Sequence, residues 1–448
     1  MSCLIDSICQ SDPSLQELIE AIVNASSLTL LVLSACRLAC VLAVKLVEEV
    51  LTQRAQPPTQ WPRCPKCGKR LRSKGFIPRQ INSIIGVICW KRRVGRCPNG
   101  CAIGQIAPLD DALGLLPYQQ TSVELQQLGC LLAIFVPFET VAVILSFISV
   151  QVSPTAVWHW VQNAGQKAMD YLNRQLEELA AGQFPQMESL DEASCALPLL
   201  MGADGVMVPF RSESGKGCTV WREIKVAVLA RLGRRGESDV PKLQQRRLVA
   251  VLGSIDALRP RLWLESLRQG ILTASRVVWL SDGGVGFWGL YAACLATYAI
   301  GVLDFYHVAQ NLWKGVKIWL DGRSKKAHLW FVSARHRLRH GETNIVLDDI
   351  RAALKLDGLP PTARKALKNL YDYLYTHQEH IQYQKFKELG LPIGSGMVES
   401  ACKWLIQQRF KGVGMRWSEA GFNHLLHLRL AWVNGRFEEL FTQERSPN

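Results

Sequence analysis

The spacing of apolar and polar positions divides the chain into helical and strand-like parts. Helical spacing covers residues 13–55, stops at Gln56-Pro-Pro, and returns from Tyr118 to about Ala180. From about Ala196 the pattern is typical of strands, and beyond residue 306 it again favours helices, at 306–390 and 394–442. We predict strands at 197–203, 206–210, 221–231, 247–252, 276–281 and 299–304, with helices near 256–269 and 286–297. Hairpin-like strands followed by alternating strands and helices predict an α/β core.

Two helices separated by a short turn are predicted upstream of these strands. The apolar run from Pro137 to Ile148 reads as the first helix. Ser153 and Pro154 open the second, as N-cap and first helical residue. The pair fits a helix-turn-helix, in which Thr155, His159 and Gln162 could face a DNA groove. An ordinary helical hairpin is the alternative.

Four cysteines have the spacing of a zinc site. Cys64-Pro-Lys-Cys67 and Cys97-Pro-Asn-Gly-Cys101 form two tight turns, and a hairpin between them would bring four thiolates into a tetrahedron. We therefore predict a structural Zn²⁺ ion. Four free surface cysteines are the alternative, and Cys89 is expected either in the core or in place of one ligand.

The charge of the chain indicates a polyanionic partner. The net charge is +14, and the stretch from Arg63 to Cys101 contains eleven Lys or Arg residues and no Asp or Glu. We expect this module to contact double-stranded DNA, although a solvated basic face would have the same composition. The candidate DNA-binding residues here are Arg70, Arg72, Lys91, Arg92 and Arg93.

An apolar stretch near the start raises the question of a membrane span. Residues Ala21 to Val44 have about the right length, but Arg37 lies in the middle and Glu48 continues the same helix. We interpret the stretch as a helix that packs on itself or on a second subunit. The first residues lack the features of a secretory signal peptide, so we expect a cytoplasmic protein that is not bound to a membrane.

Three acidic residues are the candidate catalytic groups. Asp204 and Asp282 each follow an apolar run and precede a glycine, so we expect both at strand ends where the backbone turns. Glu399 follows Ser395, the expected N-cap of a later helix. Converging carboxylates could hold two divalent ions, Mg²⁺ or Mn²⁺, with Asp204 bridging them. For a single acid after a strand, an ordinary turn residue is the alternative.

Three further residues are auxiliary candidates. Asp304 and His307 follow the next strand and are expected either to cap a helix or to contact the active site. Lys403 lies four residues after Glu399, where it could pair with that acid or contact a phosphate.

Several blocks of sequence resemble the DDE transposases of bacterial insertion sequences, most closely the Kra-type family. These blocks include Trp279-Leu-Ser-Asp-Gly, Leu303-Asp-Phe-Tyr-His, Pro392-Ile-Gly-Ser-Gly-Met-Val-Glu-Ser and Arg409-Phe-Lys-Gly-Val-Gly-Met-Arg-Trp. The resemblance implies an RNase H-like catalytic core with a five-stranded mixed sheet, in two parts at 191–307 and 394–448, around an all-helical insertion at 308–393. An N-terminal helical segment (1–55), a zinc ribbon (56–112) and a helix-turn-helix domain (113–190) would precede it.

The resemblance also implies an activity. Such a protein would bind terminal inverted repeats, cut DNA hydrolytically and join the freed 3′-hydroxyl to target DNA, as a homodimer associated with the bacterial nucleoid. Arg409, Lys411, Arg416 and Trp417 would lie near the DNA, with Trp417 able either to stack on an unpaired base or to pack in the structure. The alternatives are a cellular RNase H-like nuclease and a catalytically silent, zinc-dependent DNA-binding protein.

Overall fold

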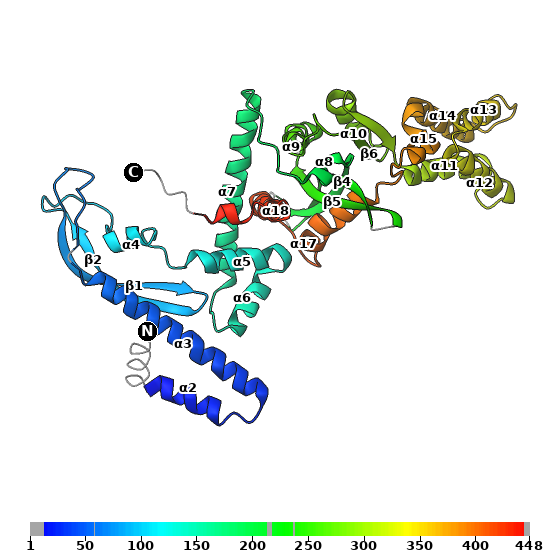
Figure 1. Ribbon diagram of the computed structural model, residues 1–448. Coiled ribbons are helices and arrows are strands. Elements are labelled where there is room, and N and C mark those ends of the chain that lie inside the picture. The colour runs from blue at the N-terminus through cyan, green and yellow to red at the C-terminus, as the bar shows by residue number, and fades with distance from the viewer. Residues whose placement is uncertain (1–12, 58, 213–216, 236–237, 443–448) are drawn as a thin grey trace. The chain divides into compact units, whose positions relative to one another are not determined.

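A computed structural model describes residues 13–57, 59–212, 217–235 and 238–442 (Figure 1). The chain forms two compact units, one of residues 1–164 with 438–448 and one of residues 165–437. Each unit is described by itself.

The first unit begins with two helices, α2 (Pro13–Val23) and α3 (Leu28–Ala55). The prediction of continuous helix over 13–55 was therefore wrong at residues 24–27. The break has a local cause, because the Ser27 side chain accepts a hydrogen bond from the Leu30 N–H and caps α3. By length and composition alone, α3 is apolar enough to cross a membrane. Near its end, however, Leu51 packs into a small core with Ile81 and Trp90.

A two-stranded hairpin and a short helix follow. Strands β1 (Arg72–Ser83) and β2 (Gly86–Arg96) pair antiparallel and turn between Ser83 and Gly86. Gly86 has φ +127°, a conformation that residues with a Cβ rarely adopt. Helix α4 (Pro108–Ala112) lies against β2.

Helices α5 (Val123–Phe135) and α6 (Phe138–Phe147) follow, and then α7 (Pro154–Ala180), which belongs to this unit as far as Ala164. The 3-10 helix η4 (Glu438–Leu440) is also part of the unit. Ser153 caps α7 as predicted, since its hydroxyl accepts a hydrogen bond from the Ala156 N–H at 3.1 Å. Val157 is buried while Thr155 and His159 are exposed, so one face of the start of α7 packs and another is open to a partner.

The second unit is built on a five-stranded sheet in the order β5-β4-β3-β6-β7. Strands β5, β4 and β3 pair antiparallel, whereas β3, β6 and β7 pair parallel. The prediction of a mixed α/β fold with a five-stranded mixed sheet is confirmed. The strands are β3 (Leu199–Arg211), β4 (Thr219–Arg235), β5 (Ser238–Leu252), β6 (Val277–Ser281) and β7 (Ala299–Leu303).

Helices cover both faces of this sheet. Residues such as Ala203 and Leu229 share a core with α9 (Ile255–Arg268), α10 (Val285–Leu290) and the π-helical turn η1 (Tyr291–Leu295). On the other face Phe210 packs against Phe422 of α18 (Glu419–Val433). The same face carries α16 (Gly396–Ala401), which is continued by the π-helical turn η3 (Cys402–Gln407) and α17 (Gln408–Phe410).

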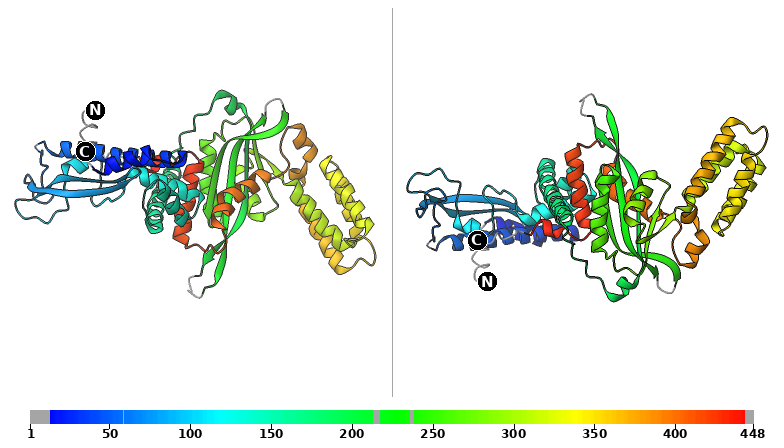
Figure 2. Two further views of the ribbon diagram at one scale, coloured as in Figure 1. Left: turned by 90° about the horizontal axis from the view of Figure 1, so that it is seen from below. Right: turned by 90° about the horizontal axis from the view of Figure 1, so that it is seen from above.

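The segment between β7 and α16 is helical throughout. Figure 2 shows most of these helices as a bundle beside the sheet rather than across one of its faces. Phe305, Leu312 and Leu370 join the bundle to the same hydrophobic core as the sheet. The helices are α11 (Phe305–Trp319), α12 (Lys325–Arg339), α13 (Thr343–Leu354), α14 (Pro361–Thr376), η2 (Gln378–Ile381) and α15 (Tyr383–Glu388).

Candidate functional sites

Asp204 lies within strand β3, not at its end. It pairs with Val226 of β4, and the ladder continues to Arg211, so the two predicted strands at 197–203 and 206–210 are one. Gly205 serves a different purpose from the predicted turn. A Cβ at Gly205 would lie 1.9 Å from Oε1 of Glu223, so the glycine makes room for a cross-strand side chain.

Asp282 follows the last residue of β6, as predicted, and stands beside Asp204. The Ser281 hydroxyl donates to the Ala203 carbonyl oxygen at 3.2 Å, which joins the residues that precede the two aspartates. Continuing the β3–β6 register from Met201 and Trp279 places Asp204 level with Asp282. The β6–β7 register, which ends at Ser281 and Leu303, places Asp304 at the same level.

The backbone around Asp282 is held on both sides. Its Oδ1 accepts a hydrogen bond from the Gly284 N–H at 3.1 Å, and its carbonyl oxygen accepts one from Trp288 Nε1 at 2.6 Å. Gly283 lies against Tyr373 of α14, whose hydroxyl would be 2.8 Å from a Cβ at that position. A helix of the bundle thus packs directly on the loop that carries Asp282.

Glu399 reaches this part of the sheet from α16. Val398, one residue earlier, packs on Gly202 of β3, where a Cβ would lie 2.8 Å from its Cγ2. The Glu399 side chain is exposed. Ser395 occupies the predicted N-cap position, and its carbonyl oxygen accepts the Val398 N–H, but its hydroxyl makes no capping bond to the helix.

The charges of the three acids act on one another. Burial is the largest influence on the pKa of Asp204 and raises it. The Gly205 N–H lowers the pKa, the charges of Asp282 and Glu399 raise it, and His307 lowers it, with a net shift upward. His307 is the only positive group among these influences on Asp204. Carboxylates gathered in this way disfavour ionisation of one another unless a cation is present.

Asp304 is fully engaged in hydrogen bonds. Its Oδ1 accepts the N–H groups of Tyr306 and His307, and its Oδ2 accepts the N–H and the hydroxyl of Ser395. Burial alone would raise the pKa of Asp304, but the hydrogen bonds from His307 and Ser395 outweigh it and hold the pKa well below the usual range. Asp304 therefore caps α11, which was one of its two predicted roles, and joins β7 to α16.

His307 is the second of the auxiliary residues. Its Nδ1 lies 3.5 Å from Asp304 Oδ1, and this contact raises the pKa of His307, with smaller contributions from Asp282 and Asp204. The side chain is half-buried and faces the acidic group. Lys403, the third, is exposed at the start of the π-helical turn η3. Among the described residues Lys403 forms no ion pair with Glu399, which leaves contact with a phosphate as its prediction.

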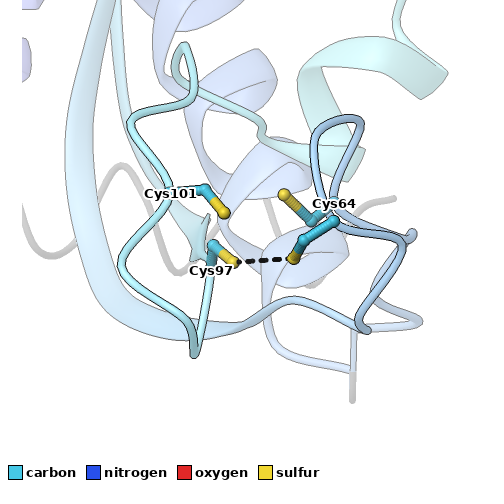
Figure 3. Close-up of side chains that lie close together, drawn as sticks. Cys64, Cys97 and Cys101 are labelled. Carbon is cyan, nitrogen blue, oxygen red and sulfur yellow. Dashed lines mark hydrogen bonds between the residues drawn. The ribbon is translucent and has the colours of Figure 1, made fainter.

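The four predicted zinc ligands come together in the first unit. The sulfur atoms of Cys64, Cys67, Cys97 and Cys101 lie within 4.8 Å of one another. The Sγ atoms of Cys67 and Cys97 are 3.4 Å apart. Figure 3 shows the sulfurs of Cys64, Cys97 and Cys101 pointing toward a common centre. This spacing and this donor set fit one tetrahedral metal ion with bonds of about 2.3 Å.

Two tight backbone turns position these sulfur atoms, and backbone N–H groups lower the pKa of one of the thiols. Gly68 and Gly100 have φ +70° and +67° and close the two turns behind Cys64 and Cys97. Desolvation alone would raise the pKa of Cys97, but backbone N–H groups of Cys101 and Asn99 lower it to about 6. Cys89 is exposed and lies outside the cluster, so neither prediction for it was correct.

The candidate DNA-binding residues differ in exposure. Arg92 is buried and pairs with Asp110 at 3.1 Å, and its guanidinium also donates to the Ile77 and Pro78 carbonyl oxygens. Arg409 is buried beneath Trp417, whose Nε1 donates to the Phe410 carbonyl oxygen. Arg92 and Arg409 are therefore too buried to contact DNA. The ring of Trp417 packs against Phe410 instead of extending into solvent. The exposed candidates are Arg70, Arg72, Lys91, Lys411 and Arg416, with Arg93 half-buried over Phe76.

Sequence reasoning missed the residues that connect the acids. Ser281 and Ser395 hold neighbouring backbones together, and Gly202 lets β3 approach both β6 and α16. A polar residue at the end of an otherwise apolar run, such as Ser281 after Val277-Val-Trp-Leu, was the available signal.

The chain was compared with known proteins by sequence and by structure. No family model matches. The chain is 26% identical over 371 residues to a protein of Streptococcus gallolyticus named "UPF0236 protein in vanSb 3'region", a match that covers 80% of this chain and 74% of that protein. A chain of the Drosophila P element transposase strand transfer complex aligns with 71% of this chain and 80% of its own length, at 10% identity and a TM-score of 0.25. That TM-score is too low to establish a common fold.

Proposed function

We propose that the chain is a DDE-type DNA transposase with an RNase H-like core. The observation that carries the proposal is the convergence of three acids in the middle of a mixed sheet, where β6 ends. Asp204 comes from β3, Asp282 directly follows β6, and Glu399 comes from α16. The sequence blocks around these acids resemble transposases of bacterial insertion sequences, and the basic, cysteine-containing module upstream suits a protein that binds DNA.

The residues at this place fit divalent ions. Carboxylate oxygens are the ligands that Mg²⁺ and Mn²⁺ prefer. Burial first, and then the charges of Asp282 and Glu399, raise the pKa of Asp204, and a bound cation would offset this cost of ionisation. Asp204, Asp282 and Glu399 would hold these ions. When bound, such ions activate a water or a 3′-hydroxyl and stabilise the leaving oxygen.

The remaining residues position these acids. Asp304 has no accepting capacity to spare, so it would set the place of α16, and hence of Glu399, rather than bind metal. Protonated His307 would balance part of the negative charge beside Asp204 when no metal is bound.

The upstream unit would supply recognition of the terminal inverted repeats. Its zinc ribbon presents exposed Arg70, Arg72 and Lys91, and the start of α7 presents Thr155 and His159. Cleavage at two ends followed by 3′-hydroxyl strand transfer would require two active sites, which is the reason to expect a homodimer on DNA.

The test is Mg²⁺-dependent cleavage of DNA that carries the coding region with its flanking sequence. Wild type is expected to cut at the ends of the element. Asp282→Ala and Glu399→Ala are expected to bind this DNA but not to cut it. Asp256→Asn removes an exposed carboxylate of α9 and should cut like wild type.

Three other results would change the conclusion. Activity retained in both variants would refute the acidic site. Cleavage without preference for the ends would favour a cellular nuclease. Binding without cleavage by any protein would favour a silent DNA-binding protein.

A further inference from the structure

An exposed tryptophan marks a surface that the proposed active site does not use. Trp221 lies near the start of β4, opposite Pro209 of β3, and 53% of its surface is exposed. Lys411 Nζ lies 5.5 Å from the centroid of its ring. The exposed ring offers a flat aromatic surface to a ligand, and a lysine over the ring is a favourable cation–π contact.

Basic side chains surround a hollow near this tryptophan. Arg211 and Arg416 line a cavity of about 390 Å³ together with Ser212, Gly217, Cys218 and Gly414, and among the described lining residues none is acidic. Arg211 Nε donates to the Arg416 carbonyl oxygen, and Arg416 Nη1 donates to the Gly217 carbonyl oxygen. Toward the described residues these bonds use one of the five N–H donors of each guanidinium, and they hold both groups in place.

Acidic residues close to the surface are already paired. Glu223, two residues along β4 from Trp221, pairs with Lys225 at 2.7 Å. Glu419 pairs with Arg222 at 2.7 Å. Among the described residues, the charge that remains next to Trp221 and the hollow is therefore positive.

Trp417 supports this surface through its backbone, and its ring is not part of the surface. Its N–H donates to the Pro209 carbonyl oxygen, and its carbonyl oxygen accepts the Arg211 N–H, so residue 417 extends the edge of β3. Its own ring packs against Phe410. This arrangement carries Lys411 and Arg416 to the part of β3 that faces Trp221.

We propose that Trp221 stacks on an unpaired base of DNA, while Lys411, Arg211 and Arg416 contact the flanking phosphates. Stacking on an aromatic ring beside a basic groove is the usual way in which proteins hold single-stranded nucleic acid. Trp221 shares a sheet face with Gly205 and Met207, whereas Asp204 points to the other face. Pro209 is about 17 Å along β3 from Asp204 at about 3.4 Å per residue, so the stacked base is not the reacting nucleotide.

The inference rests on the proposed function only in taking DNA as the ligand. It is tested with the full chain and two fluorescent oligonucleotides, a blunt duplex and the same duplex with a short single-stranded extension. Binding is measured by anisotropy with Ca²⁺ in place of Mg²⁺. The variants are Trp221→Ala, Trp221→Phe, and Val220→Ala, which truncates a neighbour that is 44% exposed on the opposite face of β4.

Wild type should bind the extended duplex more tightly than the blunt one. Trp221→Ala should weaken binding to the extended duplex by about tenfold or more, and leave binding to the blunt duplex unchanged. Trp221→Phe should keep most of the preference because it keeps an aromatic face, and Val220→Ala should behave as wild type. Quenching of 2-aminopurine placed in the extension should be lost in Trp221→Ala alone.

Each contrary result overturns the inference. Equal loss of affinity for both duplexes would make Trp221 a contact to double-stranded DNA, and no loss for either would leave it as a surface for another partner. Failure of the proposed function is a separate result: absence of Mg²⁺-dependent cleavage by wild type, with the preference for the extension intact, would refute the transposase and leave the stacking site standing.

Discussion

Asp304 Oδ2 accepts both the backbone N–H and the hydroxyl of Ser395, each at 2.5 Å. The two residues are far apart in the sequence, and the whole helical bundle lies between them. The bonds therefore hold together the two ends of the segment that forms the bundle, and they place the start of α16 against the end of β7. The position of Glu399 depends on this closure.

Asp304→Asn should destabilise the protein, because an amide NH₂ cannot accept the hydrogen bonds from Ser395. Hydrogen bonds to a buried charged group contribute about 1.5–3 kcal/mol, so we expect a loss of that size in chemical denaturation. The pKa of Asp304 is lowered in the folded protein, so its stabilisation is present above the ordinary value of 3.8 and is lost as the pH falls below it. The difference between wild type and variant should be full at pH 7 and should shrink below pH 4.

Ser395→Ala is the matched control for this contact, since it removes the hydroxyl but keeps the backbone N–H. It should cost less than Asp304→Asn, and the two changes should not be additive. Additive effects would show that Asp304 does not act through Ser395.

Asp204→Asn should leave the metal-free protein at least as stable as wild type at neutral pH. Burial and two neighbouring acids raise the pKa of Asp204, so its contribution to stability is lost as the pH rises from 3.8 through the folded value. Mg²⁺ should raise the melting temperature of wild type but not of the variant. A variant that is less stable at pH 7 without metal would contradict the crowding of charge at this site.

Cys97→Ser should abolish binding of stoichiometric zinc by the purified protein, because it removes one of four converging thiols. Cys89→Ser removes an exposed thiol outside the cluster and should retain the metal. Metal content by elemental analysis separates the two variants. Equal zinc in both would show that the cluster is not the binding site.

Gly202→Ala should be far more damaging than Gly205→Ala. A Cβ at Gly202 would lie 2.3 Å from the backbone oxygen of Leu280 and 2.8 Å from Val398, so β6 and α16 would both have to move. Overpacking of this kind costs about 1–3 kcal/mol, and it should also displace Asp282 and Glu399 and lower cleavage. At Gly205 the obstacle is the Glu223 carboxylate, the end of a flexible side chain that can turn away. Unfolding curves and cleavage rates of the two variants test this contrast.

Lys91 and Arg92 are adjacent but should behave differently. Lys91→Ala should weaken DNA binding with little change in stability, since its side chain is exposed. Asp110→Ala leaves the buried Arg92 without its charge partner, which typically costs about 3–5 kcal/mol, and should affect DNA only through folding. Denaturation and DNA titration of both variants distinguish these effects. Weaker binding in a fully stable Asp110→Ala would contradict this assignment.

Local patterns predicted much of the fold. The strands between Leu199 and Leu303 and the side-chain cap at Ser153 follow from neighbouring residues, and so does the paired spacing of the cysteines. At Ser395 the sequence predicted the position of the helix start, but the hydroxyl does not cap the helix. These features depend on backbone conformation, which a short stretch of sequence largely determines.

Burial and cross-strand contacts could not be predicted in the same way. Arg92 looks like its basic neighbours until Asp110 and two carbonyl oxygens are brought to it by folding. Gly205 suggested a turn after Asp204 because its actual reason, the carboxylate of Glu223, comes from another strand. Trp221 and Trp417 carry the same side chain, and only their packing shows which of them faces solvent.

Asp204 of β3 lies level with Asp282 and Asp304, the residues that directly follow β6 and β7, so the pairing register of the sheet sets the positions of these acidic groups. Their spacing is set by ladder hydrogen bonds and not by the side chains themselves. A point substitution at one of these positions removes one carboxylate and leaves the other two in place. Insertion or deletion of a single residue in β6 would move Asp282 by one step and turn its side chain to the opposite face. A change in the length of β6 would therefore disrupt the acidic group more than a point substitution at one of these positions.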